Sequence, residues 1–265
     1  MWVGSAKAAP AERCLATGSM RVISDRQKAQ ILKFCVASFA VYALCNLGAM
    51  LLYGGGTSSD PSARGYTFSQ NFFSDLGMVR AYSGQPNTSS LLLFASALLL
   101  MGMALISFFA IMPGYFTGSR LARTASRVGS FAGVVAGLCC AGIAATPWDL
   151  FLSAHLKFVY VLSASFLCSM LGYFVAILAN RDYPNRHAIL FAVYAVILGA
   201  YVGLMLLGPD IHTREGLTLL AAGQKVVIYA GMLCWFLQFL GAYRYHLRHY
   251  LWDHRPLAQD GPPRF

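Results

Sequence analysis

Long apolar stretches alternate with short polar ones along most of the chain after residue 30. Six predominantly apolar runs of 18 or more residues cover positions 31–53, 91–112, 128–145, 158–179, 188–207 and 226–243. Eighteen residues of α-helix rise about 27 Å, close to the thickness of the hydrocarbon core of a bilayer. Backbone N–H and C=O groups find no water in lipid, so each run has to satisfy them within a helix. The pattern therefore predicts an all-α, polytopic membrane helix bundle with six transmembrane helices.

The composition supports this prediction and excludes several other classes of protein. Of the 265 residues, 57% are hydrophobic and only 11% are charged, whereas a soluble domain carries about 25% charged residues. A soluble enzyme, a disordered chain and a secreted disulfide scaffold are excluded. Dinucleotide, phosphate-loop and serine-hydrolase fingerprints are absent from the sequence.

The basic residues predict how the chain lies in the membrane. With the N-terminus in the cytoplasm, 15 of the 20 Lys and Arg residues fall on the cytoplasmic side, in the two terminal tails, in the second and fourth loops and, for Lys33, at the start of the first apolar run. Cytoplasmic loops are enriched in Lys and Arg. We therefore expect a protein of the cell membrane (the cytoplasmic membrane in a bacterium) with both termini in the cytoplasm. Its parts are a basic tail (1–30), a six-helix membrane domain (31–245) and a second cytoplasmic tail (246–265).

The net charge of +10 follows from that distribution. Nucleic acid is therefore not expected as a partner, and membrane lipids are.

The longest connection is the outer loop 54–90, which becomes amphipathic near residues 68–77. Phe68, Phe72 and Leu76 recur every four positions, which predicts one apolar face of a short interfacial helix ending at Gly77. Asn71 and Asp75 form an adjacent polar row. The helix is either a plain cover on the bundle or part of a site.

Polar residues also mark the other two outer loops. Thr146, Pro147 and Asp149 form a capping-box pattern that assigns Asp149 to the first turn of the fourth helix. His155 is either a site residue or a solvated imidazole. For Lys157 and Lys225, a side chain that snorkels to the headgroups is the favoured interpretation. The fifth helix is expected to end at Gly208-Pro209, and Thr213 can cap the sixth.

These residues are all expected on the outer side of the membrane. Their common location predicts a ligand site in a polar cavity that opens outward. Its candidate ligand-binding residues are Asn71, Ser74, Asp75, Asp149, His155, His212 and Lys225. Asp75, Asp149 and His155 are the candidate catalytic residues. If the protein binds a metal, zinc is the candidate, with Asp75, His155 and His212 as ligands.

Small residues predict close helix packing at two places. Gly129, Gly133 and Gly137 repeat every four residues in the third helix, and Gly199 and Gly203 do so in the fifth. Such faces let helix backbones approach one another. The face on the third helix is available for packing within the chain or between chains, and no oligomeric state is predicted.

Two short motifs resemble a known family. Asn71-Phe-Phe-Ser74-Asp75-Leu76-Gly77 before the second helix, and Pro147-Trp-Asp149 followed by His155, are similar to the bacterial domain of unknown function 998. Ser-Asp-Leu-Gly also resembles the corresponding loop of the eukaryotic DRAM/Frag/Sfk proteins. The resemblance implies a six-span membrane protein, and its distant members imply a link to lipid remodelling and membrane stress.

Three functions follow as expectations. The first is a membrane component that binds or handles a lipid or small amphiphile in the outward-facing cavity. The second is a metal-dependent membrane hydrolase that uses Asp75, His155 and His212. The third is a small-solute or proton-coupled transporter, which is disfavoured because none of the six apolar runs contains Asp, Glu or His.

Overall fold

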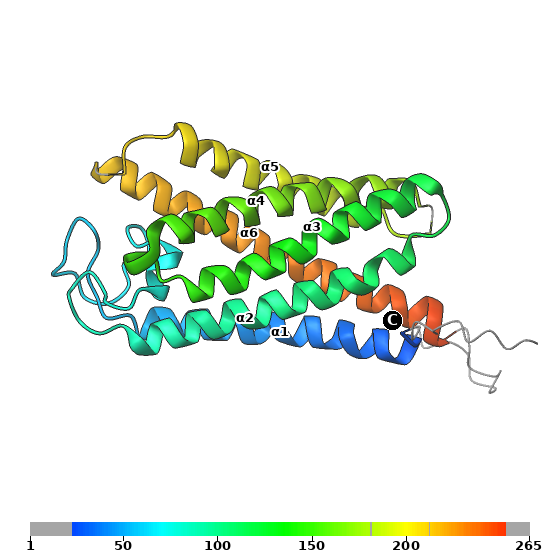
Figure 1. Cartoon of the computed structure of the whole chain (residues 1–265), viewed down its shortest axis with the longest axis horizontal. Helices are drawn as coiled ribbons and strands as arrows, with labels where there is room; N and C mark the ends of the chain where they lie inside the picture. The colour runs from blue at the N-terminus through cyan, green and yellow to red at the C-terminus, as the bar shows by residue number, and fades with distance from the viewer. Residues whose placement is uncertain (1–22, 181, 212, 253–265) are drawn as a thin grey trace, which may run out of the picture.

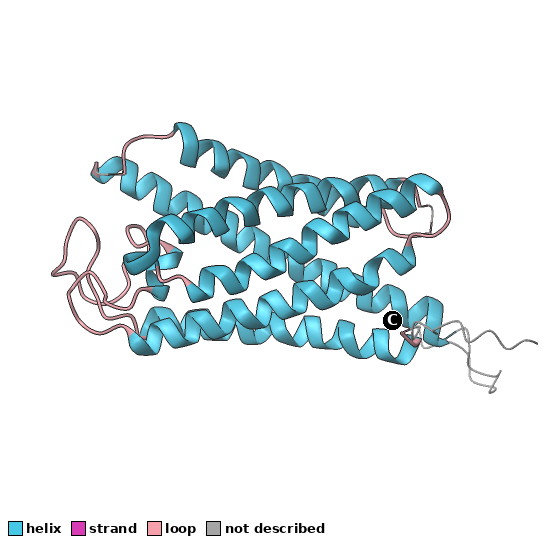
Figure 2. Cartoon of the chain, in the orientation of Figure 1, coloured by secondary structure: helices cyan, strands magenta, loops and turns pink. Residues whose placement is uncertain are grey.

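The computed structural model describes residues 23–180, 182–211 and 213–252, and this part of the chain forms a bundle of six long helices (Figure 1). They are α1 (Asp25–Leu51), α2 (Thr88–Ile111), α3 (Arg120–Ala145), α4 (Trp148–Leu178), α5 (Arg186–Leu207) and α6 (Arg214–His246). Short helices are η1 (Phe73–Gly77), η2 (Met112–Tyr115) and η3 (Leu247–Trp252). Figure 2 shows no strand in the described residues, and all six long helices are long and apolar enough to cross a membrane. The predicted fold class is confirmed.

Several helices begin earlier than the apolar runs predicted, because polar residues outside each run cap them. Ser24 accepts a hydrogen bond from the Gln27 backbone N–H, and the Gln27 side chain accepts one from Ser24. Ser119 caps α3, and Thr213 caps α6 as expected. Each side chain satisfies one of the backbone donors that a helix start leaves free.

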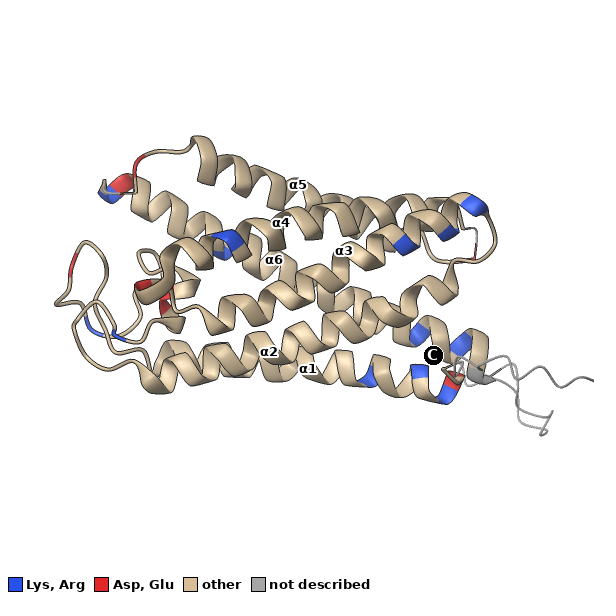
Figure 3. Cartoon of the chain, in the orientation of Figure 1, with Lys and Arg blue, Asp and Glu red and all other residues tan. Residues whose placement is uncertain are grey.

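The charged residues gather toward the two ends of the bundle (Figure 3). We call the end with the start of α1, the end of α6 and most Arg residues the arginine end. The other end carries the long loop, residues 52–87, and is called the loop end. α6 packs against α5 and also against α1, and in Figure 1 it runs obliquely from α5 at the loop end toward α1 at the arginine end.

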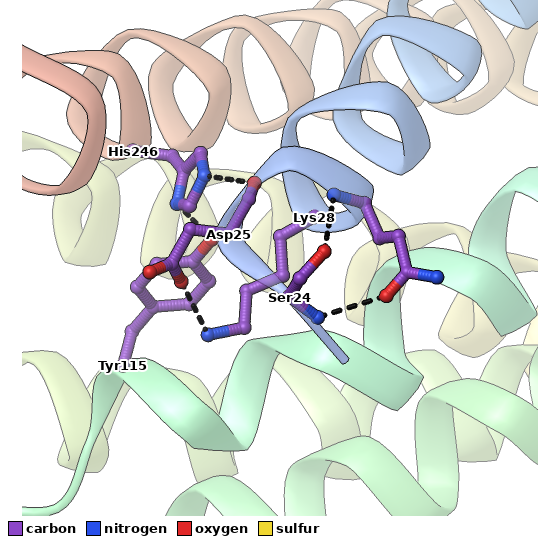
Figure 4. A network of polar contacts seen from close by, with 6 residues as sticks. Ser24, Asp25, Lys28, Tyr115 and His246 are labelled. Atoms are coloured by element: carbon purple, nitrogen blue, oxygen red, sulfur yellow. Dashed lines mark hydrogen bonds and ion pairs between the residues drawn. The ribbon is translucent and has the colours of Figure 1, made fainter. Parts of the chain in front are cut away.

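Hydrogen bonds join α1, η2 and α6 at the arginine end (Figure 4). His246 donates from Nε2 to the Asp25 carbonyl at 2.8 Å, so its Nδ1 is free to accept the Tyr115 hydroxyl at 2.9 Å. Lys28 forms an ion pair with Asp25 at 2.9 Å. The fully buried imidazole is thus satisfied at both nitrogens in its neutral form.

The glycine face of α3 packs inside the bundle. A Cβ at Gly129 would lie 2.9 Å from the Tyr173 ring of α4, one at Gly133 would overlap the Phe109 ring of α2, and one at Gly137 would lie 2.8 Å from the Gly102 carbonyl. These glycines therefore bring α2, α3 and α4 close together. The expectation for α5 is wrong: Gly199 and Gly203 have no neighbour near their Cβ positions.

The predicted helix near 68–77 is also wrong in extent. Only Phe73–Gly77 is helical, as a five-residue 3₁₀ turn. Phe68 lies outside it and stacks on Tyr229 of α6, with the ring centroids 6.0 Å apart. The spacing of the apolar residues therefore reflects contacts of an irregular loop rather than one helical face.

We expect Gly133→Ala to destabilise the bundle by about 1–3 kcal/mol, because the added methyl group meets the buried Phe109 ring. Gly199→Ala is the matched control, since its methyl group would enter open space. Thermal unfolding of both variants in one detergent measures the difference. Equal melting temperatures would contradict the packing role of Gly133.

Candidate functional site

The long loop is fixed to the bundle by buried polar side chains. Asn71 is fully buried, and its amide donates to the Gly56 carbonyl and to Asp75 Oδ2, both at 3.0 Å. Asp75 Oδ2 also accepts the Phe72 backbone N–H at 2.8 Å. Asn87 donates to the Met78 carbonyl at 3.0 Å. These bonds fold the loop onto the ends of α1, α2 and η1.

Lys225 holds this loop against α6. Its side chain is 2% exposed, and Nζ donates to the Asn71 carbonyl. The ammonium also lies 5.3 Å from the centre of the Tyr66 ring and 5.2 Å from that of Phe68. The snorkelling interpretation is therefore wrong for Lys225, whereas Lys157 is exposed.

Asp149 has a different role from the one its sequence pattern predicted. Its carboxylate accepts the backbone N–H groups of Val79 at 3.0 Å and Arg80 at 3.2 Å. Thr146 instead donates to the Gly142 carbonyl at the end of α3, and no side chain caps α4. The capping-box prediction is wrong because the loop offers Asp149 two unpaired donors.

Burial controls the ionisation of Asp75. Loss of solvent raises the pKa of its carboxyl to about 6, although hydrogen bonds from Asn71 and Phe72 and the nearby charge of Lys225 oppose the rise. Its Oδ1 atom is buried and makes no hydrogen bond. The carboxyl is therefore protonated more readily than an exposed aspartate, although it remains mostly ionised at neutral pH.

A cavity of about 760 Å³ lies beneath the loop and runs into the bundle. Its walls come from α1 to α6 and from the long loop. The apolar part includes Phe94, Leu98, Met101, Leu105, Ile143, Val159, Leu162, Phe166, Leu198, Val227, Ile228 and Met232. The polar part includes Tyr42, Ser58, Ser74, Tyr82, His155, Ser163, Tyr194, Tyr201 and Gln224.

Only two of the predicted site residues, Ser74 and His155, line this cavity. Asn71, Asp75, Asp149 and Lys225 lie outside its lining and anchor the loop instead. His212 lies outside the described residues. The expectation that all these side chains meet in one polar cavity is therefore wrong: the cavity is mainly apolar, and the loop anchors lie outside its wall.

His155 and Gln224 present polar atoms to the cavity. His155 donates from Nδ1 to the Thr146 carbonyl at 2.8 Å, which leaves its Nε2 available. Gln224 accepts the Phe73 backbone N–H with Oε1, which leaves its amide NH₂ available. Both side chains can therefore bind a ligand without losing their bonds to the protein.

The cavity reaches from the lateral surface to the centre of the bundle. Leu152 on α4 and Ile211 after α5 line it and are 51% and 44% exposed. Trp235 lines it from α6 and contacts the rings of Phe109 (5.6 Å), Phe166 (5.1 Å) and Phe191 (5.8 Å). These rings close the cavity toward the arginine end.

The cavity is also lined by Tyr42, Tyr194 and Trp235, which were not predicted as site residues from the sequence. Each places an aromatic ring with a polar tip inside an otherwise apolar run. That was the available signal, because buried Tyr and Trp normally require a hydrogen-bond partner.

Within the described residues, no group of three or more His, Cys, Asp or Glu side chains could hold a metal ion. Of the three proposed zinc ligands, His155 lines the cavity, Asp75 does not, and His212 is not described. Asp75 and His155, the two described candidates, lie in different surroundings and are fewer than the three protein ligands of a catalytic zinc site.

No protein-family model, curated protein or solved structure matches this chain. The resemblance to the domain of unknown function 998 therefore stays a prediction. What the chain can bind follows from the geometry of the cavity and its lining residues.

Since the pKa of Asp75 is raised in the folded protein, its protonated form stabilises the fold. This contribution is complete below the ordinary pKa of 3.8 and is lost as the pH rises through about 6; it amounts to at most about 3 kcal/mol. We expect Asp75→Asn to remove this part of the pH dependence, because the amide cannot ionise. Thermal unfolding between pH 4.5 and 7.5 tests it, and an unchanged pH profile would contradict it.

Proposed function

We propose that this protein binds a lipid or small amphiphile in the cavity beneath the long loop. The observation that carries the proposal is the size and lining of that cavity. Its volume of about 760 Å³ falls within the range of small-molecule sites, which are mostly apolar with a few polar groups. Protein interiors are otherwise close-packed, so a space of this size favours an occupant.

The lining supports an amphiphile rather than a simple polar solute. Apolar side chains of α2, α4 and α6 provide most of the wall, and transfer of an apolar chain from water to this wall is favourable. Ser74, His155 and Gln224 provide polar atoms near the loop. The exposed Leu152 and Ile211 favour access from the lipid side, without passage through the folded loop.

Binding is favoured over hydrolysis and transport. Asp75 and Asp149 are already engaged by the loop, so His155 is the one predicted catalytic residue that reaches the cavity. A hydrolase needs further groups to activate water and stabilise charge. Because the loop is anchored and aromatic rings close the cavity toward the arginine end, no continuous polar path crosses the described part of the bundle.

We also propose that the protein lies in the cell membrane with the arginine end in the cytoplasm. The support is the excess of Lys and Arg at that end, which matches the distribution found in cytoplasmic loops. The cavity then opens in the outer leaflet. Cysteine labelling of Ser62→Cys and Ser119→Cys from either side of sealed vesicles would decide the orientation.

A bulky side chain in the wall tests the proposed function. We expect Val159→Trp to weaken binding of pyrene-labelled dodecanol by more than tenfold, because the indole would occupy the cavity. Val161→Trp lies two residues away on the exposed side of the same helix and should bind normally. Pyrene fluorescence in purified protein measures both.

Melting temperatures of the two variants report whether each is folded. Equal binding by wild type and a folded Val159→Trp protein would place the probe elsewhere and overturn the proposed site.

A further inference from the structure

Within the described residues, no Lys, Arg, Asp or Glu side chain lines the cavity. Lys225 is next to the lining residue Gln224 in sequence, but its ammonium binds the Asn71 carbonyl and faces two aromatic rings. A charged ligand group inside the cavity would therefore lose its water without gaining a counter-ion, which is strongly unfavourable. The lining selects against ionised ligands.

Trp235 adds a polar requirement at the deep end of the cavity. Its side chain is 5% exposed, lines the cavity and has a buried indole N–H without a hydrogen-bond partner. Its surroundings include the rings of Phe108, Phe109 and Phe166, which offer no oxygen. Because indole N–H is only a donor, it needs an acceptor to avoid a penalty of about 1–3 kcal/mol.

Trp148 has a similar unpartnered N–H in the cavity wall. That indole lies close enough to Asp75 to lower the pKa of the buried carboxyl, so an acceptor within the protein is at hand. Trp235 has no comparable neighbour among its ring contacts. The unmet donor at Trp235 is therefore the one that indicates a ligand atom.

The deep end contains further neutral polar groups. The Tyr194 hydroxyl lies against Gly231, so close that a Cβ there would overlap it, and Gly231 is one helical turn from Trp235. Gln224, at the polar end near the loop, precedes Trp235 by 11 positions on α6. Along α6, the polar groups at Gln224 and those at Trp235 are thus separated by about 16 Å.

From these observations we propose that the ligand is an uncharged amphiphile with oxygen atoms at two positions about 16 Å apart. One oxygen accepts the Trp235 N–H, and the other binds among Ser74, His155 and Gln224. Diols, hydroxyketones and hydroxyesters with an apolar middle belong to this class. The inference rests on the proposed function and specifies the ligand of the same cavity.

Dodecanediol and dodecanol provide a matched pair, because they share a chain of about the required length and differ by one hydroxyl group. Each is used to displace tritiated dodecanol from the full-length protein in nanodiscs at pH 8. We expect the diol to bind about fivefold more tightly, as one additional hydrogen bond to a buried donor allows. Laurate, the carboxylate of the same chain length, should bind at least tenfold more weakly than dodecanol.

Trp235→Phe keeps an aromatic ring and removes the N–H. The variant should lose the fivefold preference for the diol over dodecanol, and its melting temperature reports whether it is folded. Equal affinities of diol and alcohol for the wild type would mean that water accepts the hydrogen bond of the Trp235 N–H. That result would overturn the deep oxygen site.

An unchanged diol preference in Trp235→Phe would overturn that site as well. Laurate binding as tight as that of dodecanol would overturn the uncharged class. Both results would leave the proposed function standing, because dodecanol still binds. Absence of binding by dodecanol and dodecanediol alike would overturn the proposed function and the ligand class together.

Discussion

The buried ammonium group of Lys225 holds the long loop against α6, together with the Gln224 side chain and the Tyr229 ring. Burying this charge is costly, and the Asn71 carbonyl, two aromatic faces and the nearby Asp75 together compensate it. Once Asn71 is fixed, Phe72, Phe73 and Ser74 follow directly in the chain and form part of the cavity wall. The shape of the candidate site therefore depends on polar side chains that do not line it.

The bundle is packed differently in its two halves. Toward the arginine end, Phe108 contacts Phe109, Trp235 and Phe239 edge to face, and the glycines of α3 bring three helices together. Toward the loop end, α6 diverges from α1, and the loop covers the space between the helices. The closely packed part of the bundle thus closes the cavity on the side of the arginine end.

The side chains that line the cavity carry no Lys, Arg, Asp or Glu charge in the described part of the chain. The polar groups of the lining are hydroxyls, an amide, an imidazole and indole N–H groups, while the charged Asp75, Asp149 and Lys225 serve the loop. Keeping charges out of the cavity lowers the cost of burying an apolar ligand and raises that of burying an ionised one. Asp75, Asp149 and Lys225 thus bind the loop and do not line the cavity.

The sequence alone determined the six helices, because a bilayer leaves each long apolar run no alternative to helical hydrogen bonding. It also located the cap at Thr213 and the end of α5 at Gly208, since local hydrogen bonding decides helix ends. Contacts between segments that are distant in the chain could not be predicted from the sequence alone. The similar glycine patterns of α3 and α5 acquired different roles because only α3 has neighbours on that face.

Asp149 matched a capping pattern but binds Val79 and Arg80, 70 and 69 positions away. The sequence favoured a snorkelling side chain for Lys225, whereas the loop buries it, and Trp235 was not predicted as a site residue. Local spacing determines which backbone conformation a segment adopts. Only the tertiary structure decides which buried donors and charges find a partner, and that is what separates the loop anchors from the ligand cavity.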